Sequence, residues 1–470
     1  SALVGDGEAS SPLVLRDDLL QFKRYFDAEA RIAARVLELA AMPAVAGIAG
    51  LSIVTGGPGT GKTTFVARKL VELRASQPGL RVALAAPTGK AAARLTESIG
   101  LRFAEVSREA SKATKGAAQS DLFAPAPTEA RTLHRLLGYS PGNDRYRRNA
   151  IDPLEDDLVI IDETSMVDVL LLDAVLRALK PGARLMLVGD HRQLASVDAG
   201  DVLGALCRAA LAEPKGTPLR DAVTLLSRSW RFEQQPGIGV LANAVLAGDA
   251  NAVYAACTNP DTPDIRLRPT AASTDALLEP MVPHLEACLA ATSPAGLLTA
   301  LDGFRILAPE RDGRVGVNGI NAAVERWIAR RGVSVTDTWY HGRPVLVTAN
   351  DYATGVFNGD VGVVWREAGQ LAVYFRGANG TIRAISPVRL PAVETAWAMT
   401  VHKSQGSEFD SVLVVVPDYD SRVMNRELLY TAVTRARRSV TIAGGGAAIA
   451  AAVERGTGRM SGLGARLGER

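Results

Sequence analysis

The sequence predicts an α/β protein built on parallel sheets that are covered by helices on both faces. Short, continuous apolar runs recur along the chain, and several precede a stretch compatible with a helix, which is the pattern of parallel strands buried on both faces. The runs fall into two clusters, so we expect two α/β domains. The expected strands are 51–55, 81–86, 158–161 and 184–188 in the first half, and 304–308, 411–416 and 439–443 in the second.

The composition fits a globular protein and sets limits on its function. At 470 residues the chain is long enough for two to four domains. The net charge is only +3, so nucleic-acid binding has to come from local basic patches. The three cysteines are far apart and match no disulfide or zinc pattern, which favours a reduced, cytoplasmic protein. The apolar stretch 36–54 is interrupted by Glu38 and Pro43, so we expect a buried helix and strand and no membrane span.

Two stretches break the alternation of strands and helices. Residues 140–156 are polar, turn-rich and rich in arginine, which indicates a small excursion on the first domain. Residues 340–390 contain short strands separated by NGD and ANG turns, which predicts a small antiparallel, barrel-like insert.

The stretch GGPGTGKTT has the pattern of a phosphate-binding loop, and it follows an apolar strand and precedes a helix. In such loops the backbone N–H groups surround phosphate oxygens, the lysine reaches the outer phosphates and the hydroxyl coordinates Mg²⁺. A plain glycine-rich turn is the alternative, but the order of strand, loop and helix favours nucleotide binding. We therefore expect Lys62 on the phosphates and Thr63 on the metal. The expected nucleotide-binding loop is Gly56, Gly57, Pro58, Gly59, Thr60, Gly61, Lys62, Thr63 and Thr64.

Two adjacent carboxylates follow another apolar strand in LVIIDETSM. The strand delivers Asp162 and Glu163 to its carboxyl end, where open α/β sheets bind their ligands. We expect Asp162 to hold the Mg²⁺ shell and Glu163 to orient or deprotonate the attacking water. A lone pair of this kind is usually a solvated strand end, and the phosphate loop upstream favours the functional interpretation.

Three further residues are candidates for contacting the phosphates. Gln193 in LVGDHRQLASVDAG ends another strand and could sense the γ-phosphate, although a polar residue there is commonplace. Phosphoryl transfer also needs cations near the developing charge, often an arginine supplied from elsewhere. Arg231 in SRSWRF and Arg435 in YTAVTRARR are the candidates, although most arginines in such segments lie on the surface.

Taken together, these stretches resemble a known family. They appear in the order of the superfamily-one helicase motifs, and the match is closer still to the RecD family, the α subunits of exonuclease V (RecBCD). The motifs span residues 51–443, nearly the whole chain. They are GGPGTGKTT (56–64), APTGKAAARL (86–95), TLHRLL (132–137), VIIDETSM (159–166), GDHRQLASVDAG (189–200), SWRF (229–232), WAMTVHKSQGSEFD (397–410) and YTAVTRARR (430–438).

The resemblance implies an ATP- and Mg²⁺-dependent helicase that moves 5′→3′ on single-stranded DNA and opens duplex ends. It implies RecB-like and RecC-like partners in a heterotrimer, a role in double-strand-break repair and recombination, and a place in the bacterial cytoplasm near the nucleoid. It implies that Lys62, Thr63, Asp162, Glu163 and Gln193 act from the first motor domain and Arg231 and Arg435 from the second. It places Gly406 and Glu408 at the ribose end of the nucleotide, and Thr88, Lys90, Thr132, His134, Thr400 and His402 on the DNA.

The same resemblance implies a division into RecA-like motor domains with ATP between them. Residues 44–222 would form the first motor domain, with a small hairpin at 140–156. Residues 223–339 and 391–470 would form the second, with an SH3-like β insert at 340–390. Residues 1–43 would be the tail of the N-terminal domain that docks on a partner in this family.

One family feature is missing from the sequence. A glutamine that contacts adenine is expected shortly before the phosphate loop, yet residues 31–55 contain none. We therefore expect the chain to be interrupted near residues 42–44, with a glutamine-containing segment absent there, and the residue that contacts adenine is not identified.

Other classes of function compete with the motor hypothesis. The intact Asp162–Glu163 pair and the two arginines argue against a nucleotide-binding subunit without motor activity. The stretch TVHKSQGSEFD holds the residue types of a hydrolytic site, but Ser404 is not in a G-x-S-x-G elbow and no third group is evident to orient His402. No nuclease site is evident, so nuclease activity of a complex would belong to a partner. The nearest alternative is a RecD-like helicase that acts alone.

Overall fold

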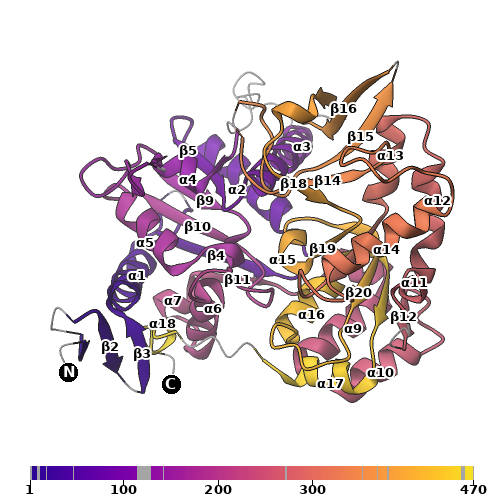
Figure 1. Cartoon of the computed structure of the whole chain (residues 1–470). Coiled ribbons are helices and arrows are strands. Elements are labelled where there is room, and N and C mark those ends of the chain that lie inside the picture. Colours follow the sequence, from indigo (N-terminus) through magenta and orange to yellow (C-terminus); the bar gives the residue numbers. More distant parts are fainter. Residues whose placement is uncertain are drawn as a thin grey trace. The chain divides into compact units, whose positions relative to one another are not determined.

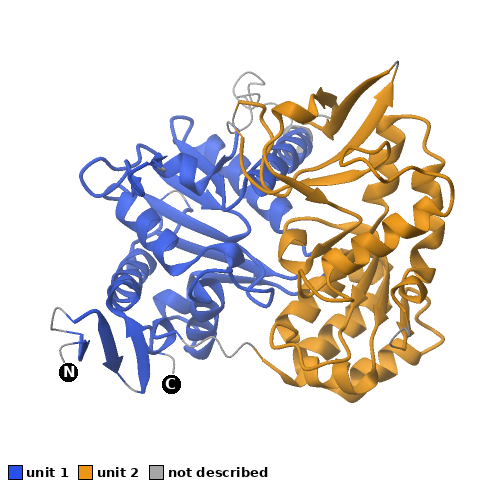
Figure 2. Cartoon of the chain, viewed as in Figure 1, with its two compact units in different colours: residues 1–229, 458–470 blue, residues 230–457 orange. Residues whose placement is uncertain are grey.

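The computed structural model divides the chain into two compact units, shown in Figure 2. Unit 1 is Ser1–Ser229 with Gly458–Arg470, and unit 2 is Trp230–Thr457. The structure describes residues 3–7, 11–16, 18–45, 47–113, 129–140, 142–269, 273–351, 353–367, 369–377, 380–456 and 461–468.

Unit 1 is built on a six-stranded parallel sheet, which confirms the four strands predicted in the first half of the chain. The strand order is β11-β4-β10-β9-β5-β6. The strands are β4 (Leu51–Gly56), β5 (Val82–Ala86), β6 (Arg131–Thr132), β9 (Leu158–Ile161), β10 (Arg184–Gly189) and β11 (Val223–Leu226).

Alternate residues of these strands pack into two separate apolar cores, one on each face of the sheet. Leu51 and Ile53 of β4 belong to one core, and Val54 belongs to the other. Helices therefore cover both faces, as Figure 1 shows. The helices on the first face are α1 (Lys23–Ala41), α4 (Leu133–Leu137), α5 (Val169–Ala178), α6 (Val202–Ala212), α7 (Pro218–Asp221) and α18 (Leu463–Arg466), and those on the second are α2 (Lys62–Ser76) and α3 (Gly89–Ala113).

The two ends of the described chain meet in unit 1. A small sheet of β1 (Val4–Gly5), β2 (Leu13–Arg16) and β3 (Leu19–Phe22) precedes α1. The buried Glu29 of α1 accepts hydrogen bonds from the Ser461 hydroxyl and the Gly462 N–H group. The last residues therefore belong with unit 1 and not with the second motor domain, where they were predicted.

The predicted boundary between residues 222 and 223 is also displaced. Strand β11 pairs with β4 from Val223 to Leu226, so residues 223–229 complete the sheet of unit 1. The apolar run of β11 is short, and the sequence alone gave no sign of which sheet it would join.

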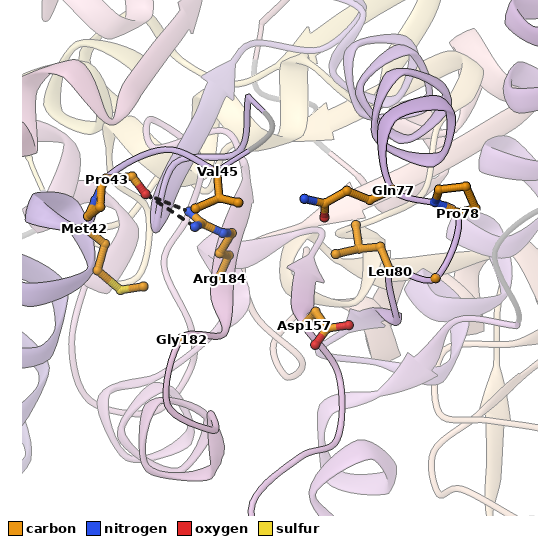
Figure 3. A pocket seen from close by; sticks show the side chains of 10 residues that line it. Met42, Pro43, Val45, Gln77, Pro78, Leu80, Asp157, Gly182 and Arg184 are labelled. Atoms are coloured by element: carbon orange, nitrogen blue, oxygen red, sulfur yellow. Dashed lines mark hydrogen bonds between the residues drawn. The ribbon is translucent and has the colours of Figure 1, made fainter.

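Residues 42–45 precede the strand that leads into the phosphate loop, and the expected interruption near residues 42–44 stays a prediction. Val45 pairs with Ile48 in an isolated bridge, and the Pro43 carbonyl accepts hydrogen bonds from both terminal nitrogens of Arg184 at 3.3 Å. Figure 3 shows these bonds on one wall of a pocket of about 650 Å³, with Leu80 on another wall. The pocket lies where β4, β5, β9 and β10 begin, at the sheet edge opposite the phosphate loop.

Unit 2 is built on a five-stranded parallel sheet, which confirms the three strands predicted in the second half. The strand order is β12-β21-β20-β13-β19. The strands are β12 (Ile265–Arg268), β13 (Phe304–Ala308), β19 (Ala398–Thr400), β20 (Phe409–Val415) and β21 (Ala436–Ala443). The α-helices are α8 (Trp230–Gln234), α9 (Pro236–Ala247), α10 (Ala250–Thr258), α11 (Thr274–Leu277), α12 (Val282–Leu289), α13 (Pro294–Asp302), α14 (Val317–Ala329), α15 (Val401–Ser404), α16 (Arg426–Val433) and α17 (Gly446–Glu454).

An antiparallel sheet within unit 2 forms where the sequence predicted a β insert. Its order is β17-β16-β15-β14-β18, and it encloses an apolar core of its own. The strands are β14 (Pro344–Val347), β15 (Val361–Glu367), β16 (Gln370–Arg376), β17 (Ile382–Ile385) and β18 (Val393–Thr395). In unit 1, β7 (Tyr139–Ser140) and β8 (Arg145–Tyr146) form a two-stranded antiparallel pair that overlaps the start of the predicted excursion 140–156. None of the described helices combines the length and the apolar character that a membrane crossing requires.

Candidate nucleotide and DNA sites

The backbone of the phosphate loop needs glycine at three positions. Gly59 and Gly61 have φ angles of 72° and 84°, in the left-handed region that favours glycine. At Gly56, an added Cβ atom would lie 2.5 Å from the Leu226 carbonyl oxygen. The loop therefore packs against the end of β11, and this close approach fixes the point where the chain leaves β4.

The Lys62 side chain is folded onto this loop. Its Nζ atom donates to the carbonyl oxygens of Gly56 at 2.7 Å and Gly57 at 3.0 Å. Across the described ranges, Lys62 forms no ion pair, so its charge is not neutralised by a carboxylate within 4 Å. An ammonium group held at a helix N-terminus without a carboxylate partner fits the phosphates of a nucleotide.

The adjacent carboxylates lie at the carboxyl end of β9, as predicted. Glu163 has a φ angle of 52°, an uncommon conformation for a residue with a side chain and one that is found at functional sites. Its N–H group donates to Asp162 Oδ1 at 2.9 Å. Desolvation and the neighbouring charge of Glu163 raise the pKa of Asp162 to about 6. A buried carboxylate that resists ionisation, with a second carboxylate beside it, fits a divalent cation, since the charge of the cation would stabilise the anionic form of Asp162.

Gln193 follows β10, which lies between β4 and β9 in the sheet. Its side chain is only 7% exposed, and its amide nitrogen donates to Asp190 Oδ2 at 3.3 Å. Within the part of the chain that the structure describes, the buried Gln193 Oε1 atom has no hydrogen-bond partner. An unsatisfied buried polar atom is costly in a folded protein, and a ligand or ordered water would remove that cost.

A contact that the sequence analysis missed joins this segment to the strand of the phosphate loop. His191 Nδ1 lies 2.7 Å from the hydroxyl of the buried Thr55, and the His191 N–H group donates to the same oxygen at 3.2 Å. Burial lowers the pKa of His191, so the ring is held in its neutral form. The signal in the sequence was the threonine that ends the run LSIVT, directly before the phosphate loop.

Ser229, in the motif SWRF, also touches the phosphate loop. Its hydroxyl donates to the Pro58 carbonyl at 2.8 Å, within unit 1. The sequence analysis gave this serine no role.

Arg231 belongs to unit 2, where it pairs with another predicted site residue. Its Nη2 atom donates to Glu408 Oε1 at 2.6 Å. Among the described residues, no acceptor lies within hydrogen-bond distance of its buried Nη1 atom. The arginine thus keeps one buried donor for a further acceptor.

Arg435 is buried, and its side chain contacts backbone carbonyls. The residue is 3% exposed, and its guanidinium donates to the carbonyl oxygens of Thr431 at 3.0 Å and Ser407 at 3.3 Å. Its own carbonyl accepts from the Phe409 N–H group at 2.9 Å. Arg435 therefore holds residues 407–409 in this structure, and its contact with a nucleotide stays a prediction.

The three threonines predicted on the DNA share one structural position. Each lies at the end of a parallel strand or just after it, and its side-chain oxygen caps the helix that comes next. Thr88 accepts from the Ala91 N–H group, Thr132 from Arg135 and Thr400 from Lys403, at 3.2, 3.1 and 3.3 Å. These caps place the threonines at the carboxyl edges of the sheets of their units, and Lys90 and His402 follow Thr88 and Thr400 by two residues.

His134 lies in an aromatic cluster. Its ring centroid is 5.1 Å from that of Tyr139 and 6.0 Å from that of Tyr146, so the two-stranded β7–β8 pair packs against the start of α4. Rings at this spacing stabilise each other through edge contacts. The three residues hold the predicted DNA-binding motif TLHRLL against the excursion that follows it.

The fold and these residues define a class of protein. In unit 1 the phosphate loop, the carboxylate pair and Gln193 lie at the carboxyl ends of the neighbouring strands β4, β9 and β10. This is the arrangement of P-loop proteins with RecA-like parallel sheets. Residues 40–199 match the family model described as an AAA domain, and residues 395–443 match that of the UvrD-like helicase C-terminal domain.

Curated relatives identify the family. The RecBCD enzyme subunit RecD of Mycobacterium tuberculosis is 44% identical over 439 residues, which cover 89% of this chain and 71% of that protein. The chain belongs to the RecD family. The ATP-dependent RecD2 DNA helicase of Deinococcus radiodurans is 34% identical over 414 residues, 86% of this chain and 48% of that protein. Among solved structures, the Pif1 helicase from Candida albicans has a TM-score of 0.44 at 17% identity and covers 89% of this chain and 94% of its own.

Proposed function

We propose that this chain is an ATP-dependent DNA helicase, the motor subunit of a RecBCD-type helicase–nuclease. The observation that carries the proposal is the carboxyl edge of the unit 1 sheet. There, Lys62 lies on a phosphate loop and forms no ion pair among the described residues, and Asp162 and Glu163 follow β9, which is separated from β4 by β10 alone. Membership of the RecD family connects this nucleotide site with DNA unwinding.

The residues of unit 1 would carry out the hydrolysis of ATP. Lys62 and the N–H groups of the loop bind the phosphates, and Thr63 and Asp162 hold Mg²⁺, which supplies charge stabilisation to the transferred phosphoryl group. Glu163 orients the attacking water and takes its proton. Gln193, with its unsatisfied Oε1 atom, is positioned to hold that water or to respond to the γ-phosphate.

The residues of unit 2 would complete the site and connect it to DNA. We assign phosphate contacts to Arg231 and Arg435, and the ribose end of the nucleotide to Gly406 and Glu408. Thr88, Lys90, Thr132, His134, Thr400 and His402 would contact the DNA backbone, which suits a motor because backbone contacts do not depend on sequence. Binding and hydrolysis of ATP would then alternate two states of the chain that hold the DNA differently, and so advance the strand.

Several finer features are proposed from family membership alone. They are 5′→3′ movement, assembly with RecB-like and RecC-like subunits, a role in double-strand-break repair and recombination at the bacterial nucleoid, and a likeness of the β14–β18 sheet to SH3 domains. We likewise propose that this chain contributes no nuclease site.

A lysine substitution tests the proposal. Lys62→Ala removes the charge that binds the phosphates, so DNA-stimulated ATP turnover and unwinding should both be abolished while the circular dichroism spectrum is unchanged. The exposed Lys215 provides the matched control, since Lys215→Ala should leave both activities intact. Normal turnover in Lys62→Ala would reject the nucleotide site.

The partner assignment needs a separate experiment. When the chain is purified from its native cell with a small affinity tag, we expect RecB-like and RecC-like subunits to co-purify in equal amounts. Recovery of a fully active helicase with no such partners would instead support a helicase that acts alone.

A further inference from the structure

Strand β13 lies between the two strands that hold the ends of the segment 401–408. β13 pairs with β19 on one side and with β20 on the other. The chain leaves β19 at Thr400, forms the segment 401–408 and enters β20 at Phe409. We call residues 401–408 the coupling segment, because the proposed function assigns DNA contact to its first residues and nucleotide contact to its last.

One buried side chain of β13 contacts both flanks of the coupling segment. Arg305 is 1% exposed, and its Nη1 atom donates to the Ala396 carbonyl at 2.5 Å, just before β19. The carbon at the centre of its guanidinium lies 4.8 Å from the centroid of the Phe409 ring, the first residue of β20. A third contact, from Nη2 to the Leu301 carbonyl at 3.3 Å, fixes the guanidinium to the end of α13.

Burying the Arg305 guanidinium in this part of the core costs free energy. Among the described residues it forms no ion pair, and its buried Nε atom has no hydrogen-bond partner. Burial lowers the pKa of Arg305 to about 10, which reflects the cost of removing the charge from water. Replacing buried charged groups with apolar residues of similar size is often neutral or stabilising. Stability alone therefore does not account for an arginine at this position.

Other buried polar side chains hold the same flank. The Asn321 amide nitrogen donates to the Thr395 carbonyl at 2.9 Å, and its oxygen accepts from the Ala398 N–H group at 2.8 Å. The Trp397 indole donates to the Tyr340 hydroxyl at 3.0 Å. With Arg305 on Ala396, each residue from 395 to 398 is held by a specific polar bond. The first flank is thus fixed in register, and among these groups only Arg305 also contacts Phe409 at the second flank.

We propose that Arg305 is a positioning residue that fixes the two flanks of the coupling segment relative to each other, and so transmits DNA binding to the nucleotide site. The proposal rests on the proposed function, since it concerns how ATP turnover responds to DNA. A side chain that only filled space would contribute to stability and not to this response. Arg305 contacts neither ligand and acts through the backbone of Ala396 and the ring of Phe409.

The test compares stability with DNA stimulation in the full chain. Arg305→Met keeps an unbranched apolar side chain, shorter than that of arginine, but loses the charge and the bond to Ala396. Its melting temperature is expected to equal or exceed that of the wild type, and its ATP turnover without DNA to stay within about twofold, because the phosphate loop is untouched. The stimulation of turnover by a single-stranded oligo(dT) should fall by about tenfold to a hundredfold, the loss expected when reacting groups are displaced by about 1 Å.

Two further variants complete the experiment. Arg305→Lys retains a cation but cannot make both carbonyl bonds. The stimulation of its ATP turnover by DNA should therefore lie between those of Arg305→Met and the wild type. If Arg305→Met fails to fold, Arg305→Lys is the variant that tests the proposal. Arg330→Met removes an exposed arginine of the same unit and should behave as wild type. If DNA stimulates ATP turnover as strongly in folded Arg305→Met, or in Arg305→Lys, as in the wild type, the role inferred for Arg305 is wrong and the proposed function is unaffected. A wild-type chain whose turnover does not respond to DNA would instead reject the proposed function, and the inference with it.

Discussion

The Arg231 guanidinium lies 2.6 Å from the Glu408 carboxylate, and this ion pair joins two motifs of unit 2 that are far apart in the sequence. Both partners are partly buried, at 16% and 34% side-chain exposure, so the pair is less screened than one on the surface. It orients Arg231 while leaving its buried Nη1 atom without an acceptor among the described residues. An arginine held in this way is suited to donate a hydrogen bond to a phosphate oxygen without losing its partner.

Removing the Arg231 side chain should lower the maximal rate of ATP hydrolysis by about a thousandfold, the contribution of an arginine that stabilises phosphoryl transfer. Steady-state ATPase assays with saturating DNA measure this. The exposed Arg268, which pairs with Glu279, gives the control variant Arg268→Ala, expected to match the wild type. If Arg231→Ala lowers the rate only to the extent that this control does, Arg231 has no role in the reaction.

Glu163→Gln should separate nucleotide binding from hydrolysis. The amide cannot take a proton from water, so turnover is expected to fall by roughly 10²- to 10⁴-fold. Fluorescent ATP analogues should still bind, because Lys62 and Asp162 are unchanged, and removing the Glu163 charge relieves the repulsion that raises the pKa of Asp162. Loss of nucleotide binding in this variant would show that Glu163 belongs to the metal shell instead.

The strands were predictable because their signal is local. Runs such as LVII and the VLVV of β20 are apolar without interruption, which is typical of strands in a sheet buried on both faces. The phosphate loop and the carboxylate pair were predictable for a similar reason, since each directly follows such a run.

The partners of charged side chains were not predictable, because they depend on backbone atoms brought together by the fold. Arg435 and Arg305 both bind carbonyl oxygens, and every residue type offers a carbonyl. The ion pair between Arg231 and Glu408 joins residues that no local pattern connects. The membership of β11 in the first sheet likewise depends on how closely Leu226 approaches Gly56, which the sequence does not show.

Gly56→Ala should destabilise unit 1 by roughly 1–3 kcal/mol, the usual cost of forcing extra volume into a packed site. The new methyl group would lie 2.5 Å from the Leu226 carbonyl, so either β11 or the phosphate loop has to move. Chemical denaturation gives the free energy of unfolding. Gly79→Ala is the control, because nothing lies within 4 Å of a Cβ atom there. Equal stability of the two variants would show that β11 does not pack on the loop as described.

The neutral form of His191 should make the stability of the protein depend on pH. Burial lowers the pKa of His191 below its ordinary 6.5, so the unfolded chain takes up a proton at a higher pH than the folded chain does. The contribution of His191 to the free energy of unfolding should therefore be largest above pH 6.5 and decrease as the pH falls below it, while the raised pKa of Asp162 contributes with the opposite sign. His191→Asn, which keeps an amide near Thr55, should reduce this slope by at most about 1.4 kcal/mol per pH unit. Part of the slope should remain, since burial also lowers the pKa of His284 and His341. Denaturation curves at several pH values measure both slopes, and identical slopes would mean that His191 is not held neutral by its contact with Thr55.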